Sequence, residues 1–184
     1  MTAAPRSLDA APELNWAALW ALAQPWSEFF SPAMDLAPLW QGVWRQASAP
    51  GWAVDRLKAG PPVQLLALNH DWCWDAANTV PWIARLAEAV PGTEFKTLLR
   101  DEHPEVMDRF LTRGTRSIPI IFGLGGDFTL LGHWGPRPAA LQAWFYQHRH
   151  TLPKEQRYQE MRRWYLKDRG ESTLRELMAA IGRG

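Results

Sequence analysis

The sequence predicts an α/β domain in which helices flank a four-stranded mixed β-sheet. Residues 63–99 have the pattern of a β-α-β unit, because two short apolar runs enclose one long helix with apolar periodicity. Residues 118–134 contain two apolar segments on either side of Gly125-Gly126-Asp127, which is typical of a β-hairpin. Helical periodicity dominates the chain before and after these segments.

The first sixty residues are expected to form a helical extension that is rich in tryptophan. Leu14–Gln24 and Ala33–Gln46 place apolar residues at helical spacing, with Asn15 and Ser31 as candidate N-terminal caps. We expect the tryptophans to pack these helices onto the domain behind them; a ligand-stacking platform is the alternative, and a homodimer interface is left open. The tryptophans concerned are Trp16, Trp20, Trp26, Trp40, Trp44 and Trp52.

The β-α-β unit begins with an apolar run at Val63–Leu68, bounded by breakers, which predicts a buried strand. A turn then leads into a helix that runs to about Ala89, and Glu94–Leu99 is predicted as the second strand. Because such crossovers are right-handed, the two strands are expected to be parallel.

The remaining segments complete the predicted domain. They are a short helix at Pro104–Leu111, strands at Ile118–Leu124 and Phe128–Trp134, and helices at Pro138–His148, Pro153–Lys167 and Ser172–Ile181. We therefore divide the chain into an N-terminal helical extension (1–60), a central α/β domain (61–150) and C-terminal helices packed on the same domain (151–184).

Composition indicates a protein that recognises its partners locally. Twenty Lys and Arg against nineteen Asp and Glu give a net charge of +1, so we expect neither nucleic acid nor a membrane surface as partner. The basic run Arg157–Arg169 also contains Glu160 and Asp168, which favours a solvated helix face. Charged residues interrupt Met1–Gln24 where a signal peptide needs an apolar run, so a cytoplasmic location is expected.

Cys73 is the only cysteine, so the chain cannot form a disulfide within itself. It follows the first predicted strand and opens the helix, where the positive end of the helix dipole lowers a thiol pKa. Burial by Trp72 and Trp74 and the negative charges of Asp71 and Asp75 would raise that pKa. The sequence leaves open which effect is larger.

Three motifs around this cysteine resemble those of the thioredoxin superfamily. The string D-W-C-W-D-A at 71–76, with Pro81 eight residues after the cysteine, resembles the thioredoxin active-site turn. The string R-S-I-P at 116–119 is similar to the segment that carries the cis-proline of thioredoxins. With W-G-P-R-P at 134–138, the set is similar to a bacterial branch of thioredoxin-family proteins, and the resemblance covers residues 63 to about 149.

The resemblance implies a thioredoxin-like fold with Cys73 as the nucleophile and a cis peptide bond before Pro119. Backbone beside that bond would then be free to pair with an extended peptide held over the sulfur. The residues implied in substrate binding are Trp72, Trp74, Asp75, Arg116, Ser117, Ile118 and Pro119.

Two departures from the family pattern limit the chemistry. The resolving cysteine is replaced by Ala76, and the buried acid six residues before the nucleophile is replaced by Ala67. We predict a monothiol thiol–disulfide oxidoreductase that uses Cys73, needs no cofactor and relies on an external resolving thiol, with a protein or low-molecular-weight thiol or disulfide as partner. The alternative is a redox-inactive thioredoxin-like module that binds peptides or proteins.

Arg116 lies three residues before Pro119, which the resemblance places near the thiol. It is predicted either to stabilise the thiolate or an acidic substrate, or to form an ion pair with Asp71, Asp75 or Asp101. The sequence does not separate these two roles.

His70 suggests two further interpretations, and both are disfavoured. His70 and Cys73 supply only two metal ligands, so no metal site is expected. A peroxidatic cysteine is disfavoured because peroxiredoxins place a threonine where His70 stands, three residues before the cysteine.

Overall fold

The computed structural model describes residues 13–184, so the first twelve residues of the predicted N-terminal extension lie outside the described part of the chain. Its helices and strands follow the predicted order closely. They are α1 (Trp16–Leu22), β1 (Gln24–Pro25), α2 (Trp26–Phe29), α3 (Ala37–Gln46), α4 (Gly51–Lys58), β2 (Gln64–Asn69), α5 (Trp74–Ala89), β3 (Phe95–Leu99), the 3-10 helix η1 (Arg100–Glu102), α6 (Pro104–Met107), β4 (Ile120–Leu124), β5 (Leu130–Trp134), α7 (Ala139–His148), α8 (Lys154–Asp168) and α9 (Glu171–Ala180).

The sheet is mixed, with strand order β1-β3-β2-β4-β5, and this confirms the predicted α/β architecture. The central strand β2 pairs in parallel with β3 and antiparallel with β4, and β5 pairs antiparallel with β4. The sheet has five strands where four were predicted, because Gln24 and Pro25 of β1 pair with the outer side of β3. A two-residue strand that contains proline shows no alternation in sequence, and proline is tolerated there because the strand is at the edge.

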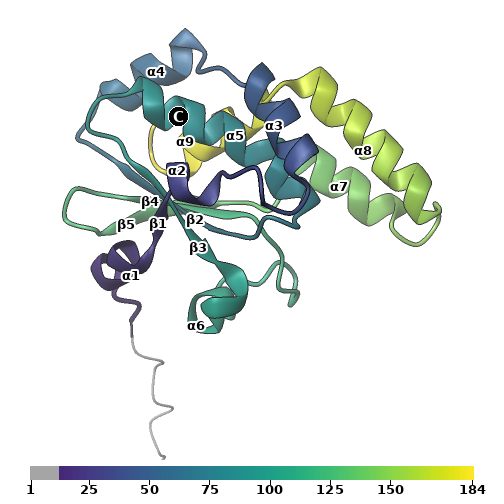
Figure 1. Cartoon of the computed structure of the whole chain (residues 1–184), viewed down its shortest axis with the longest axis horizontal. Helices are drawn as coiled ribbons and strands as arrows, with labels where there is room; N and C mark the ends of the chain where they lie inside the picture. Colours follow the sequence, from purple (N-terminus) through teal and green to yellow (C-terminus); the bar gives the residue numbers. More distant parts are fainter. Residues whose placement is uncertain (1–12) are drawn as a thin grey trace, which may run out of the picture.

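Helices cover both faces of the sheet. In Figure 1, α3, α4, α5 and α9 lie on one side of the strands, and α1 and α6 lie on the other. The core lies at β2, whose residues from Leu65 to Asn69 are all buried, and α5 packs over it. Gly132 of β5 allows α9 to approach closely, since a Cβ atom there would collide with the carbonyl group of Ala180.

Of the two N-terminal caps predicted in this region, the structure contains one. Asn15 caps α1, because its side-chain oxygen accepts a hydrogen bond from the N–H of Ala18 at 3.0 Å. Ser31 does not cap α3; its hydroxyl accepts from Ala33 at 3.1 Å, and the helix begins only after Leu36.

An aromatic layer formed by α2 and α3 packs against α5 and β3. We call the group Trp26, Phe29, Phe30, Trp40 and Trp44 the N-terminal aromatic layer. The ring of Trp26 lies 5.4 Å from that of Trp44 and 5.7 Å from that of Phe95 in β3, measured between ring centroids. The packing role expected for these tryptophans therefore agrees with the structure, because the layer is continuous with the main core.

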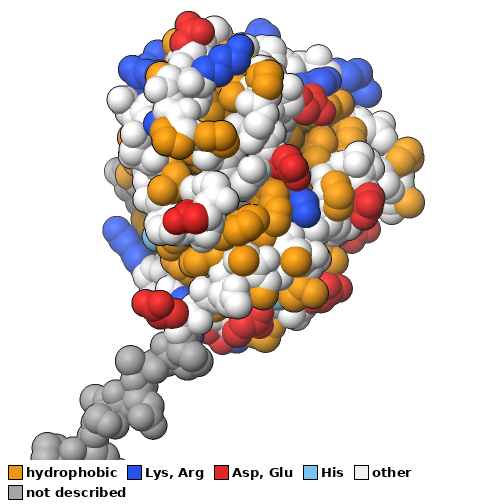
Figure 2. Space-filling view, turned by 90° about the vertical axis from the view of Figure 1, so that its left-hand side faces the viewer, with side chains coloured by type: hydrophobic (Ala, Val, Ile, Leu, Met, Phe, Trp, Pro, Cys, Tyr) orange, Lys and Arg blue, Asp and Glu red, His pale blue; other side chains and the backbone are white. Residues whose placement is uncertain are grey.

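Helices α7 and α8 form a hairpin that projects from one end of the molecule (Figure 1). We call residues 139–168 the helical hairpin. On a different face, which contains α1, α4 and the end of the β4–β5 hairpin, Figure 2 shows apolar side chains scattered among charged ones of both signs. Over residues 13–184, no helix has the length and apolar character needed to span a membrane.

Candidate functional site

Cys73 lies at the N-terminus of α5, immediately after the turn that follows β2. The turn is closed by a hydrogen bond from the N–H of Cys73 to the carbonyl oxygen of His70 at 3.1 Å. Two hydrogen bonds from the N-terminal region hold this turn. The Asp71 side chain accepts one from the N–H of Asp35 at 2.8 Å, and the Asp71 carbonyl oxygen accepts one from Nε1 of Trp40 at 2.7 Å. The position of the thiol thus depends on the N-terminal helices as well as on β2 and α5.

The segment that precedes β4 lies directly against Cys73. The Cys73 thiol donates a hydrogen bond to the carbonyl oxygen of Ile118, with Sγ 3.4 Å from that oxygen, and the Ile118–Pro119 peptide bond is cis. Pairing of β4 with β2 begins only at Ile120, opposite Leu68. The structure therefore brings Cys73, Ile118 and Pro119 together, with Ser117 next to them and outside the paired part of the strand.

The environment of Cys73 keeps its thiol protonated. Cys73 is 7% exposed, and burial raises its pKa from an ordinary value of 9.0 to about 12, with a further contribution from the negative charge of Asp75. The N–H groups of Ala76 and Asp75 and the positive charge of Arg137 act in the opposite direction. Burial is the larger effect, which answers the question that the sequence left open.

Asp75 is the centre of a buried polar network beside the thiol. Its Oδ2 lies 2.5 Å from Nη2 of Arg137, and its Oδ1 accepts a hydrogen bond from the Tyr165 hydroxyl at 3.0 Å. Burial raises the pKa of Asp75, while Arg137 and Tyr165 act to lower it. The Asp75 carboxyl group in turn raises the pKa of Arg137, so the guanidinium stays charged. The network joins the start of α5 to the helical hairpin.

The loop between β5 and α7 places Arg137 in this network. Gly135 has a φ of 134°, and a Cβ atom on it would collide with the carbonyl group of Pro119, so only glycine lets this loop approach the segment before β4. The Gly135–Pro136 peptide bond is also cis. Arg137 then extends over the Phe145 ring, with its guanidinium carbon 4.3 Å from the ring centroid.

The two tryptophans that flank Cys73 have different surroundings. Trp72 is 39% exposed; its ring stacks on His70 at 4.8 Å, and the Arg100 guanidinium lies 4.6 Å from the ring centroid. Trp74 is half-buried and packs edge-on against Tyr165, with ring centroids 5.6 Å apart. Trp72 therefore offers an ordered aromatic surface beside the thiol, whereas Trp74 packs against the helical hairpin.

Arg116 forms no ion pair with Asp71, Asp75 or Asp101 and is not the cation that acts on the Cys73 thiol. Its Nε and Nη2 donate to the two carboxylate oxygens of Asp108 at 2.6 and 2.7 Å, and both side chains are exposed. The cation that acts on Cys73 is Arg137, which the sequence analysis left without a role. Tyr165 was also missed, because it lies 90 positions after Asp75 and no local pattern links the two.

His70 is engaged by carboxylates. Its Nδ1 lies 2.7 Å from Oδ1 of Asp71, and its Nε2 lies 3.8 Å from Oδ2 of Asp101. Within the described part of the chain, no group of three or more His, Cys, Asp or Glu side chains could hold a metal ion.

Comparison with known proteins gives a family and a fold. The sequence model described as thioredoxin matches residues 44–171. The structure is similar to an HIV epitope-scaffold, with a TM-score of 0.68 and 16% identity over 93% of this chain and 99% of that chain. It is also similar to a protein of unknown function from Pseudomonas aeruginosa, with a TM-score of 0.67 and 16% identity over 91% and 96% of the two chains. No curated protein matches the sequence.

Proposed function

Because this chain belongs to the thioredoxin family, we propose that it is a protein-binding module in which Cys73 stays a protonated thiol. One observation carries this proposal: the thiol is buried and donates its hydrogen to the carbonyl oxygen of Ile118 at 3.4 Å. Disulfide exchange needs a thiolate that an incoming disulfide can reach. Burial and the bond to Ile118 oppose both requirements.

The replacement of the second cysteine supports the same function. Ala76 occupies that position in the first turn of α5 and is fully buried. Cys73 is the only cysteine of the chain, so a mixed disulfide formed on it could not be resolved by a second thiol of the same molecule. The fold of the site is retained while the dithiol chemistry is absent.

The backbone before β4 is the binding surface that we propose. Ser117 and Ile118 precede the part of β4 that pairs with β2, so an extended segment of a partner can add to them as a further strand. Trp72, held by His70 and Arg100, supplies an exposed apolar surface beside it. The bound species is then an extended protein segment.

Monothiol disulfide exchange is the second candidate, and one observation favours it. The N–H groups of Ala76 and Asp75 and the charge of Arg137 all act to stabilise a Cys73 thiolate. In that reaction the thiolate attacks one sulfur of a disulfide, forms a mixed disulfide and releases the other half as a thiolate. An external thiolate then attacks the adduct, takes over the bound half as a new disulfide and regenerates Cys73.

Intact mass after treatment with glutathione disulfide separates the two functions. We expect no adduct on the native chain at pH 7 and one adduct per chain when it is unfolded in guanidinium, which shows that the thiol itself is competent. Alkylation by iodoacetamide at pH 8 should be about a thousandfold slower on the native chain, since its thiol pKa is about three units higher. A native adduct that free thiol removes would instead establish the monothiol reaction.

Selection of binding peptides from a random displayed library tests the binding function directly. Peptides selected on the native chain should bind the Cys73→Ala variant equally well and the Trp72→Ala variant at least tenfold more weakly. Trp52→Ala is the matched control, because Trp52 is a half-buried tryptophan on α4 whose Nε1 donates to Glu171, away from this surface. Loss of peptide binding in Cys73→Ala would contradict a binding role without covalent chemistry.

A further inference from the structure

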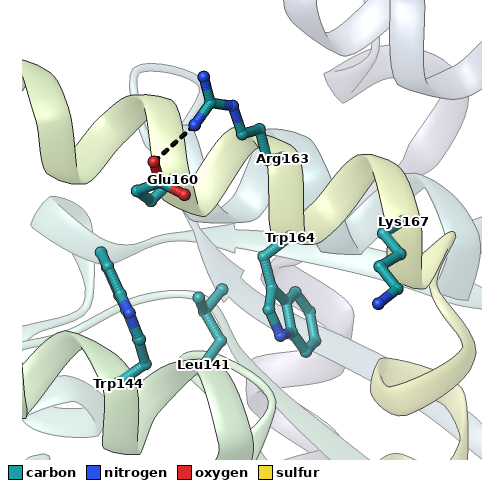
Figure 3. Close-up of a pocket in the computed structure, with 6 residues that line it drawn as sticks. All are labelled: Leu141, Trp144, Glu160, Arg163, Trp164 and Lys167. Atoms are coloured by element: carbon teal, nitrogen blue, oxygen red, sulfur yellow. Dashed lines mark hydrogen bonds and ion pairs between the residues drawn. The ribbon is translucent and has the colours of Figure 1, made fainter.

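The helical hairpin contains a cavity that plays no part in the site at Cys73. It has a volume of about 220 Å³ and lies between α7 and α8. Figure 3 shows Leu141 and Trp144 rising from α7 and Trp164 descending from α8, so that the two indoles stand on either side of Leu141. Leu141 is buried and forms the floor, whereas both tryptophans are half-buried and form the walls.

Neighbouring side chains hold both indoles in place. The His148 ring stacks on Trp144 at 4.6 Å with an interplanar angle of 21°, and its Nδ1 lies 2.8 Å from the Trp144 carbonyl oxygen. Trp164 packs perpendicular to Tyr165, with ring centroids 5.5 Å apart. Among residues 13–184, no aromatic contact joins Trp144 to Trp164. The two walls are therefore preorganised with a gap between them.

The volume of the cavity suits a single side chain of a partner better than a small molecule or cofactor. Sites for small molecules and cofactors usually have volumes of about 300–1,000 Å³, and this cavity is smaller. Two indole walls favour a ring as the occupant, because offset and edge-to-face aromatic pairs add to the free energy gained from burial. Tryptophan is also among the residues that contribute most to protein–protein binding, and it tends to pair with such a residue on the partner.

The net charge of the helical hairpin favours acidic residues on either side of that ring in the partner. Residues 139–168 contain six Lys and Arg against three Asp and Glu, whereas the whole chain has a net charge of only +1. At the rim, Glu160 is neutralised by Arg163 at 2.6 Å. Lys167 lies at the same rim and makes no ion pair within the described residues (Figure 3). The unbalanced charge next to the cavity is positive.

We propose that this cavity is a docking site for an acidic segment of a partner protein, which inserts one aromatic side chain between Trp144 and Trp164 and places a carboxylate near Lys167. The surface is separate from the backbone at Ser117 and Ile118, so this inference does not depend on the binding function proposed above. Trp74, next to Cys73 in the sequence, contacts Tyr165 of the hairpin with ring centroids 5.6 Å apart.

Fluorescence anisotropy with a labelled nonapeptide tests this proposal on the full chain. The peptide carries one central Trp flanked by Asp and Glu, and two control peptides replace the Trp by Ala or the acids by Lys. We expect saturable binding of the acidic Trp peptide, and binding at least tenfold weaker for each control. Failure of the acidic peptide to bind, or equal binding of either control peptide, would overturn the proposal.

Matched variants locate the binding. Trp164→Ala and Lys167→Glu should weaken it at least tenfold and about threefold to tenfold, respectively, and the effect of Lys167→Glu should shrink as salt is raised. Trp52→Ala and Lys58→Glu on α4 should leave it unchanged. Lys167 is exposed, so its substitution keeps the test valid if Trp164→Ala fails to fold.

Two further probes distinguish other occupants. Indole-3-acetate that displaces the peptide at equal or lower concentration would assign the cavity to small aromatic acids and overturn the protein-segment proposal. Binding of a short single-stranded RNA that Lys167→Glu abolishes, without binding of the acidic peptide, would assign it to nucleic acid. No displacement by indole-3-acetate and no binding of the RNA, together with the variant effects above, support the proposal.

Discussion

Two tryptophan-rich regions flank α5, and they use the same residue type differently. In the N-terminal aromatic layer, Trp26 contacts five other rings, including Phe95 of the sheet, and Trp40 is completely buried. In the helical hairpin, Trp144 and Trp164 pack on a small cluster of Leu141, Met161 and Tyr165 that is separate from the main core. The first region is continuous with the main core, whereas in the second two half-buried indoles line a cavity.

The difference shows what continuity with the sheet provides. Trp26, Phe29 and Trp40 of the first region are buried in the main core, so they contribute to stability. Trp74 and the network of Asp75, Arg137 and Tyr165 join the hairpin to α5. Its tryptophans Trp144 and Trp164 stay half-buried, so they are partly available for binding. Cys73 lies at the start of α5, between the turn that Trp40 holds and the buried Asp75.

Removal of a ring from the N-terminal aromatic layer should have the largest effect. Trp40→Ala is expected to reduce the free energy of unfolding by about 4 kcal/mol, because it leaves a large cavity and removes the hydrogen bond to the Asp71 carbonyl oxygen. Equilibrium denaturation in guanidinium measures this loss. Trp52→Ala, which removes a half-buried ring, should cost clearly less; equal losses would contradict the special role of the layer.

Removal of the Arg137 charge, which joins the hairpin to α5, should have the second-largest effect on stability. Arg137→Met is expected to reduce the free energy of unfolding by about 3 kcal/mol, since it leaves the buried Asp75 without its cation. Adding Asp75→Asn should restore much of that loss in a double-mutant cycle. Arg116→Met breaks an exposed ion pair with Asp108 and should have no measurable effect. Additive effects of the two substitutions at 75 and 137 would show that the pair is not coupled.

Local patterns were sufficient to predict most of the fold. The β-α-β unit and the β4–β5 hairpin are encoded in contiguous residues, so periodicity and the Gly125-Gly126-Asp127 turn revealed them. The strand β1 was missed because two residues show no period. The position of Cys73 at the start of α5 was also readable, since it depends only on where a strand ends and a helix begins.

The chemistry of the site depends on contacts between distant residues, and these were not readable. Arg116 was placed near Cys73 by its distance in sequence from Pro119, whereas its side chain turns to Asp108. Burial of the thiol results from packing of the N-terminal region and of the segment before β4 around the start of α5. No pattern in the sequence reports how completely these segments exclude water.

Removal of a ring from the helical hairpin should lower the free energy of unfolding less than removal of one from the N-terminal aromatic layer. Trp164→Ala is expected to reduce the free energy of unfolding by about 2 kcal/mol, because the side chain is half-buried and its loss enlarges an existing cavity. The same guanidinium titration measures it. A loss as large as that of Trp40→Ala would mean that the hairpin belongs to the main core, and the contrast between the two regions would fail.

Ionisation of Cys73 should give the smallest effect, and it reports on the burial of the thiol at the start of α5. Between pH 9 and 12 the folded chain keeps the thiol proton, whereas the unfolded chain loses it above its ordinary pKa of 9.0. The folded state therefore binds more protons in this window, and the free energy of unfolding falls as the pH rises. By pH 10 the loss from this group should be about 1.4 kcal/mol.

The Cys73→Ala variant isolates this contribution. Burial also raises the pKa of Tyr165, but that effect is present in both proteins and cancels when their profiles are subtracted. We expect the difference in unfolding free energy between wild type and Cys73→Ala to be constant from pH 6 to 8 and to fall by about 1.4 kcal/mol at pH 10. A constant difference up to pH 10 would mean that water reaches the thiol. Burial at the start of α5 would then not keep Cys73 protonated, and disulfide exchange would become the better-supported function.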